Sequence, residues 1–285
     1  MRPRPRSWLT VLGVLAWLAS HQFGIRAAEK AMAATPPTLE DVAAGKAVIV
    51  DLTYALNAKN PYWPGPGYTP FQLKPIATLE KNGVLSQAFC TPEHLGTHLD
   101  APNHFEANQP DVSAIPPESL FARGVVIDVS GAVAADPDYR LTTAEIARWE
   151  REHGPIPQEA VVFLHTGWGA YWNNYSRYAN RDALGKMHFP GYSAEAARFL
   201  IDERKAKGVG IDTLSMDYGL SRDFVVHHVV LKAKRYGLEN VANLDRLPPR
   251  GFFVVVAPIK IEHGSGGPTR IFAIFPREAD GQKKP

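Results

Sequence analysis

The chain has 285 residues, of which 45% are hydrophobic and 21% charged, so it is an ordinary globular protein with enough residues to bury a substantial core. Its single cysteine, Cys90, excludes an intramolecular disulfide framework. The formal net charge is only +2, and the sequence contains no basic patch of the kind that nucleic-acid binding requires.

The N-terminal stretch 1–33 has the pattern of a secretory signal. A basic start is followed by an apolar run at 8–20, and 31–33 (AMA) offers a small-residue cleavage site. The run is short for a membrane span, and the alternatives are an uncleaved anchor or a misassigned start. Cleavage after Ala33 would remove five basic residues and one acidic residue and bring the net charge to −2. We expect a periplasmic or secreted mature protein without stable membrane insertion and without a nucleic-acid partner.

Predicted strands and helices alternate along most of the remaining chain. Apolar and β-branched runs predict buried strands or short extended segments at 47–53, 85–90, 124–130, 160–165, 209–212, 214–217, 252–258 and 269–275. Capping residues and apolar spacing predict a short helix from Thr38 and helices from Thr142 to His153, from Ser193 to Gly208 and from Val225 to Arg235. No repeat or linker divides the chain. We therefore expect one α/β or α+β domain with a mixed sheet at 34–276, and a loose polar tail at 277–285.

Two stiff loops, at 60–67 and 166–172, are rich in glycine and carry aromatic side chains. Aromatic residues in such loops either cap a core or form the walls of an apolar ligand pocket. We expect the walls of a substrate pocket to include Tyr62, Trp63, Trp168, Tyr171 and Trp172.

The stretch 94–104 is the strongest chemical signal, because three of the ten histidines and one carboxylate lie within it. Imidazole nitrogen and carboxylate oxygen suit zinc, manganese or iron, and the absence of thiolate argues against a closed structural zinc site. The glycine and prolines of the stretch favour a loop over a regular element. His94, His98 and Asp100 cannot share one face of a single helix or strand, so their convergence requires a break at Gly96.

The same stretch resembles a known family. Residues 94–104 (HLGTHLDAPNH) fill every fixed place of the HxGTHxDxPxH motif of the bacterial cyclase family, which contains kynurenine formamidases and isatin hydrolases. Further matches lie at 63–65, 212–217, 227, 239–240, 243–248 and 264–268. The resemblance implies a swivelling β/β/α fold, with a mixed sheet or partly closed barrel flanked by helices. It also implies a homodimer or a larger homo-oligomer.

The resemblance further implies a ligand set and a cofactor. His94, His98 and Asp100 would hold the first metal ion, and His227 and Glu239 would complete a second or shared position. Formamidase-like members bridge two zinc ions through residues that match Asp100 and Glu239, whereas isatin-hydrolase-like members use a manganese ion. The expected cofactor is therefore Zn²⁺ or Mn²⁺, as one or two ions.

Two histidine assignments complete the expected site. Neighbours on a helix point about 100° apart, so at most one of His227 and His228 faces the metal, and the spacing to Glu239 favours His227. His104 resembles the family's catalytic histidine. An imidazole with an ordinary pKa of about 6.5 can take a proton from water and return it to a departing nitrogen.

These features predict a metal-dependent amidohydrolase. A bound divalent ion lowers the pKa of its water from about 15.7 towards about 7 and polarises the carbonyl under attack. The sequence contains no G-x-S-x-G elbow and no Walker A pattern. The expected substrate is an aryl formamide such as N-formylkynurenine or a cyclic aryl amide such as isatin, and export counts against a role in the cytosolic breakdown of tryptophan. The alternatives are a non-catalytic periplasmic protein that binds a small aromatic ligand, and a metal site that serves only stability.

Overall fold

The computed structural model describes residues 37–277, so the predicted signal peptide and nearly all of the predicted tail lie outside the described residues. A mixed eight-stranded sheet forms the centre, in the order β1-β12-β11-β5-β7-β9-β10-β4. Because β4 also pairs with β12, seven strands close into a barrel, and β1 continues along the free edge of β12. The prediction of a single α/β domain with a mixed, partly closed barrel is confirmed.

The barrel combines both strand directions. Strands β5, β7, β9 and β10 are parallel, whereas β11, β12 and β4 pair antiparallel with their neighbours. The strands of this sheet are β1 Ala47–Asp51, β4 His98–Asp100, β5 Phe121–Asp128, β7 Val161–His165, β9 Gly208–Ile211, β10 Tyr236–Glu239, β11 Phe252–Pro258 and β12 Gly266–Pro276. Two small sheets pair β2 Gln72–Ala77 with β3 Ser86–Cys90, and β6 Arg140–Leu141 with β8 Gly191–Tyr192.

Helix α5 (Thr143–His153) begins and ends where the sequence predicts. The Thr142 hydroxyl accepts the N–H of Glu145 while the Glu145 carboxylate accepts the N–H of Thr142, and Gly154 ends the helix. The other α-helices are α2 Leu39–Ala43, α3 Leu79–Asn82, α4 Ser130–Val133, α6 Tyr175–Ala179, α7 Ala194–Arg198 and α8 Val225–Lys232. Short 3₁₀ turns lie at Pro102–His104, Val112–Ala114, Pro117–Leu120, Trp168–Tyr171 and Leu244–Arg246, and a π turn over Phe199–Glu203 extends α7.

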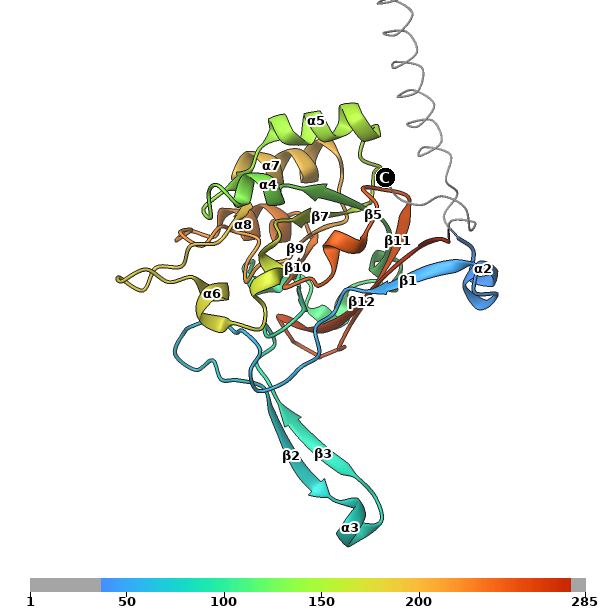
Figure 1. Cartoon of the computed structure of the whole chain (residues 1–285), viewed down its shortest axis with the longest axis vertical. Coiled ribbons are helices and arrows are strands. Elements are labelled where there is room, and N and C mark those ends of the chain that lie inside the picture. The colour runs from blue at the N-terminus through green and yellow to red at the C-terminus, as the bar shows by residue number, and fades with distance from the viewer. Residues whose placement is uncertain (1–36, 278–285) are drawn as a thin grey trace, which may run out of the picture.

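Helices α4, α5, α7 and α8 cover one side of the barrel, and the β2–β3 hairpin projects from it (Figure 1). The larger hydrophobic cluster lies between these helices and the parallel strands, and includes Ile146, Trp149 and Leu164. A second cluster fills the barrel interior and includes Phe163 and Phe252. Because a small barrel of this kind is filled by its own side chains, the chemistry must lie at its rim. Within residues 37–277, no helix combines the length and apolarity needed to cross a membrane.

Several local predictions are wrong for identifiable reasons. The stretch expected as a loop contains β4, a three-residue strand held by its two non-local partners. The short extended segment expected at 214–217 is an irregular stretch with bends, in which Glu239 accepts the N–H of Met216 and Asp217 forms an isolated bridge with Tyr192. Helix α8 ends at Lys232, before Lys234 turns left-handed with φ 59°. Strand β10 and strand β2 of the hairpin were not predicted, since neither has a strong apolar alternation, whereas β3 was predicted at 85–90.

A histidine joins two loops outside the barrel. His188 Nδ1 lies 2.7 Å from Asp138 Oδ2, and its Nε2 lies 3.6 Å from Asp182 Oδ2. The hydrogen bond to Asp138 and the nearby negative charge raise the pKa of His188 above its ordinary value. The native state therefore binds the histidine proton more tightly than the unfolded chain does.

This linkage predicts a stability effect that depends on pH. The contribution of His188 is fully present below the unfolded pKa of about 6.5 and is lost as the pH rises through the higher folded pKa. His188→Gln should lower the free energy of unfolding by up to about 1 kcal/mol near pH 5.5, and by nearly nothing near pH 9. Urea unfolding of both proteins at the two pH values measures this difference. An equal loss at both would show that the histidine contributes by packing and not by charge.

Candidate metal centre

The pairing of β4 with β10 assembles the first part of the site. His98 and Asp100 lie two residues apart on β4 and so point to the same face of the strand. The antiparallel register places Glu239 of β10 opposite His98. His98 Nε2 lies 3.2 Å from Asp100 Oδ1 and 3.4 Å from Glu239 Oε2, and all three side chains are buried. A non-local strand pair thus brings one histidine and two carboxylates together.

Helix α8 supplies the second histidine. His227 Nε2 lies 3.6 Å from Asp100 Oδ2 and 3.2 Å from Glu239 Oε1. Each carboxylate therefore presents one oxygen to His98 and the other to His227. His228 points elsewhere: its Nδ1 pairs with Glu106 Oε1 at 2.7 Å and its side chain is 49% exposed. The structure brings His227, and not His228, to the cluster.

His94 lies beside this cluster. Its Nδ1 is 2.7 Å from Asp100 Oδ1, and its Nε2 is 2.9 Å from Ser265 Oγ. The Ser265 hydroxyl donates its proton to Glu93 and must therefore accept from the Nε2–H of His94. In a neutral His94, the nitrogen that faces Asp100 then carries no proton.

Two glycines make this convergence possible. Gly96 has a φ of 69°, the left-handed conformation that the break between His94 and His98 requires, and a Cβ there would lie 2.7 Å from Leu56. At Gly266, a Cβ would lie 2.4 Å from the Leu99 carbonyl oxygen and 2.7 Å from the His94 ring. The close approach of β12 to β4 therefore depends on a glycine at this position.

The other two histidines also present an unprotonated nitrogen to the carboxylates in their neutral form. His98 Nδ1 donates to the Gly96 carbonyl at 2.9 Å, and His227 Nδ1 donates to Asp217 at 2.7 Å. In each ring the proton is held on the far side, so Nε2 is free to act as a ligand. Three bare imidazole nitrogens thus surround two carboxylates.

The two carboxylates attract positive charge strongly. Burial lowers the pKa of His98, but the charges and hydrogen bonds of Asp100 and Glu239 outweigh burial and raise it to about 10. Burial likewise lowers the pKa of His227, and Asp217 and Glu239 outweigh it and raise the value to about 10. Burial raises the pKa of Asp100, yet the neighbouring histidines hold it well below its ordinary range. Protons on the histidines, or a cation among them, must balance these carboxylates.

The arrangement fits a divalent metal ion. His98 Nε2 and Asp100 Oδ2 are buried atoms without a hydrogen-bond partner, and both point into the cluster. Donor atoms that share one ion at about 2.1 Å lie roughly 3.0–3.5 Å apart, close to the separations between histidine nitrogen and carboxylate oxygen here. Two groups of residues can each offer such converging atoms: His94, Asp100 and His104, and His98, Asp100 and Glu239.

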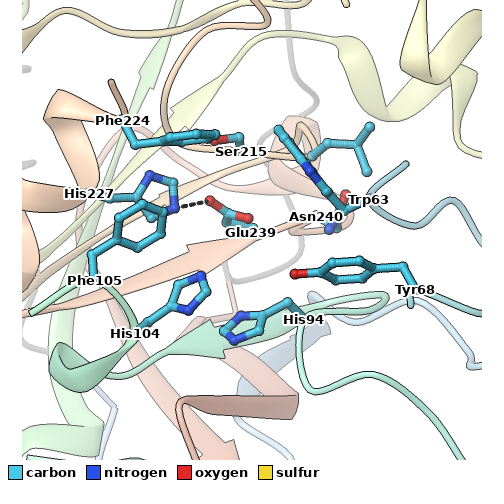
Figure 2. A pocket seen from close by; sticks show the side chains of 11 residues that line it. Trp63, Tyr68, His94, His104, Phe105, Ser215, Phe224, His227, Glu239 and Asn240 are labelled. Carbon is cyan, nitrogen blue, oxygen red and sulfur yellow. Dashed lines mark ion pairs between the residues drawn. The ribbon is translucent and has the colours of Figure 1, made fainter. Parts of the chain in front are cut away.

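His104 connects this centre to a cavity of about 220 Å³ (Figure 2). Its ring stacks on His94 with centroids 3.8 Å apart. Burial, together with the charges of the neighbouring histidines, lowers the pKa of His104 to about 4, so the ring is neutral at neutral pH. The walls are mainly aromatic and are formed by Trp63, Tyr68, Phe105 and Phe224.

Most of the aromatic residues that the sequence predicts as pocket walls lie elsewhere in the structure. Of the five expected side chains, only Trp63 lines the cavity. Tyr62 instead stacks on Tyr175, with ring centroids 5.4 Å apart. Trp168 and Trp172 are each only 5% exposed and belong to the core, because the strand before them delivers the loop beneath the helices. Tyr171 lines a different cavity.

The residues that the sequence analysis missed adjoin its motifs. Phe105 follows His104 directly, and Phe224 lies three residues before His227. Asp217, which holds His227 Nδ1, is the last residue of the stretch 212–217 that matches the family. The position of these residues next to the motifs was therefore the signal in the sequence that could have identified them.

The sequence of this chain is similar to those of known proteins. A family model described as "Putative cyclase" matches residues 50–218. Isatin hydrolase from Roseibium aggregatum is 35% identical over 193 residues, which are 65% of this chain and 73% of the relative. Kynurenine formamidase from Bacillus anthracis is 25% identical over 222 residues, which are 78% of this chain and 94% of the relative.

Solved structures agree with the sequence relatives. Isatin hydrolase A from Ralstonia solanacearum superimposes with a TM-score of 0.80 at 36% identity, covering 85% of this chain and 98% of that one. An isatin hydrolase bound to the product analogue thioisatinate gives a TM-score of 0.79 at 30% identity, covering 84% of this chain and 96% of that one. With its motif, its barrel and its histidine–carboxylate cluster, this chain belongs to the cyclase family.

Proposed function

We propose that this protein is a metal-dependent amide hydrolase that opens the ring of isatin or a closely related cyclic aryl amide. The proposal is carried by one observation: three imidazole nitrogens face two buried carboxylates at the floor of an aromatic cavity. Relatives named isatin hydrolase and kynurenine formamidase support the reaction class, hydrolysis of a carbon–nitrogen bond other than a peptide bond.

The lining of the cavity favours a compact, uncharged substrate. Among residues 37–277, no lysine or arginine lines the cavity, so none of these residues offers a cationic side chain to pair with the carboxylate of an amino-acid substrate such as N-formylkynurenine. A flat bicyclic amide needs only aromatic contact and a polar floor, which Trp63, Phe105 and Phe224 supply together with the histidines. The greater identity to an isatin hydrolase, 35% against 25%, points the same way.

The residues would divide the work of hydrolysis. A bound divalent ion supplies Lewis acidity, which polarises the amide carbonyl and makes water more acidic. His104 is neutral at working pH and borders the cavity, so it is placed to take the proton of the attacking water and pass it to the ring nitrogen as the carbon–nitrogen bond breaks. The aromatic walls orient the ring and exclude bulk water.

The proposed cofactor is Zn²⁺ or Mn²⁺. The donors are nitrogen and oxygen, which both metals accept. The two oxygens of Asp100 and of Glu239 divide between His98 and His227, which supports two neighbouring ion positions. Metal analysis of the purified protein decides the identity and the number of ions.

The proposal predicts a substrate preference. The metal-replete protein should hydrolyse isatin with a kcat/KM at least about 100-fold above that for N-formylkynurenine, since a charged group buried without a partner costs several kcal/mol. Chelation should abolish turnover, and added Mn²⁺ or Zn²⁺ should restore it. Absorbance assays with both substrates measure this. A preference for N-formylkynurenine would contradict the substrate assignment, and binding of isatin without turnover would favour the non-catalytic alternative.

The role of His104 predicts a separation of metal binding from turnover. His104→Ala should lower kcat by roughly 10²- to 10⁴-fold while bound metal stays near the wild-type amount. His188→Gln is the matched control, because it changes a histidine outside the cavity and should leave both quantities unchanged. Elemental analysis beside steady-state kinetics gives the two readouts. Full activity with metal retained would remove His104 from the mechanism.

A homodimer or larger homo-oligomer is also proposed. It is supported by the projecting hairpin, whose Leu73, Ile76, Leu85 and Phe89 are each more than half exposed. A two-stranded hairpin with such side chains is only marginally stable in water without a partner surface.

The assembly predicts a response to charge on the hairpin. Ile76→Lys combined with Leu85→Lys should shift the sedimenting species to the monomer. Leu184→Lys places the same charge at a 78% exposed leucine in another loop and should leave the assembly intact. A wild-type protein that sediments as a monomer would contradict the proposal.

Export to the periplasm or the medium is proposed from the basic start, the apolar run and the AMA site of the N-terminal stretch. When the full chain is expressed in a Gram-negative host, the mature protein should be recovered outside the cytoplasm with Ala34 as its first residue. Ala33→Arg should block cleavage and leave the full-length mass. Mass spectrometry of the fractionated protein reads both results, and an uncleaved wild-type chain held in the membrane would support the anchor instead.

A further inference from the structure

Asp217 has a hydrogen-bonding role that none of the expected site residues has. It is the last residue of the stretch 212–217, and its carboxylate is buried beside the start of α8. One oxygen accepts from His227 Nδ1 at 2.7 Å and from the His227 backbone N–H at 3.1 Å. The other accepts from the Val226 N–H at 3.1 Å and the Ser221 hydroxyl at 3.2 Å. Both oxygens are therefore occupied by donors.

These contacts fix the start of α8. Phe224, at the N-cap position, adopts a φ of 47° and provides no side-chain cap, so the free N–H groups of the first turn need an acceptor from elsewhere. Asp217 provides it, and its negative charge suits a helix N-terminus. The same carboxylate thus fixes the backbone of His227 and the orientation of its ring.

The contact with Asp217 also distinguishes His227 from the other two histidines by the type of hydrogen-bond partner. His98 gives its Nδ1–H to a neutral backbone carbonyl, and His94 gives its Nε2–H to a serine hydroxyl. Within the described cluster, only His227 gives the proton of its outer nitrogen to a carboxylate that lies outside the metal donor set. A carboxylate in that position makes the opposite nitrogen a stronger ligand than a carbonyl does.

We propose that Asp217 is a positioning residue that sets the metal affinity of the half-site formed by His227, Asp100 and Glu239. It holds the Nδ1 side of the His227 ring and so directs Nε2 at the two carboxylates. The proposal rests on the metal-dependent function above, but it concerns binding and not turnover. Asp217 does not itself line the cavity and contacts none of the donor atoms of the cluster, so its effect acts through His227.

The test is a titration of metal-free protein with Co²⁺, in which calorimetry and visible absorption measure the binding. Asp217→Asn keeps an oxygen for the helix N–H groups but removes the charge, and should weaken one binding step by about 10- to 100-fold. His227→Ala should weaken the same step. In the His227→Ala background, Asp217→Asn should change the affinity no further, because the ring through which it acts is gone.

A control separates positioning from loss of the helix cap. Ser193→Ala removes the side-chain cap of α7, which accepts the Ala196 N–H, and should lower thermal stability without changing Co²⁺ affinity. If Asp217→Asn does not fold, Asp217→Ser, which keeps a capping oxygen, replaces it in the comparison with and without His227. Wild-type affinity in the folded variant, or an equal weakening with and without His227, would overturn the proposal. Neither result depends on whether isatin is hydrolysed, so the two proposals fail independently.

Discussion

Two buried carboxylates, Asp100 and Glu239, govern the structure around the site. Within the part of the chain that the structure describes, neither pairs with a lysine or an arginine, and three histidine rings surround them. Removing two such charges from water is costly unless a cation or protons balance them. Both carboxylates lie where β4 pairs with β10 on one side and with β12 on the other. The same strand pairings therefore close the barrel and assemble the site.

This coupling links metal binding to folding. The orphaned His98 Nε2 and Asp100 Oδ2 lie at the pairing that closes the barrel. A ligand that binds only the native arrangement stabilises it by mass action, and the histidines must release their protons as the metal binds. The hydrogen bonds that hold each ring, to Gly96, Ser265 and Asp217, come from protein groups outside the metal donor set. They preorganise the donors, which lowers the cost of ordering them on binding.

The chemical selectivity of the site arises from a different part of the chain. Trp63 and Tyr68 come from the loop before the hairpin, whereas Phe105 and Phe224 flank the metal-binding segments. Trp63 and Phe105 also pack against the larger hydrophobic cluster, but these side chains lie on loops and not on the strands that carry the two carboxylates. A family can therefore keep one centre and change its substrate by changing the walls.

The resemblance to the cyclase family supplied His227 as the partner of Glu239. The sequence by itself determined the local chemistry of the 94–104 motif, the capped helix α5 and the buried strands. Such features depend on residue type and short spacing, which a single chain displays directly. Tertiary structure alone decided that a three-residue segment becomes the closing strand β4, that Trp168 and Trp172 enter the core, and that Asp217 holds His227. These outcomes follow from non-local pairing and burial. A three-residue strand has no periodicity to read, and an aromatic loop has the same composition whether it walls a cavity or fills a core.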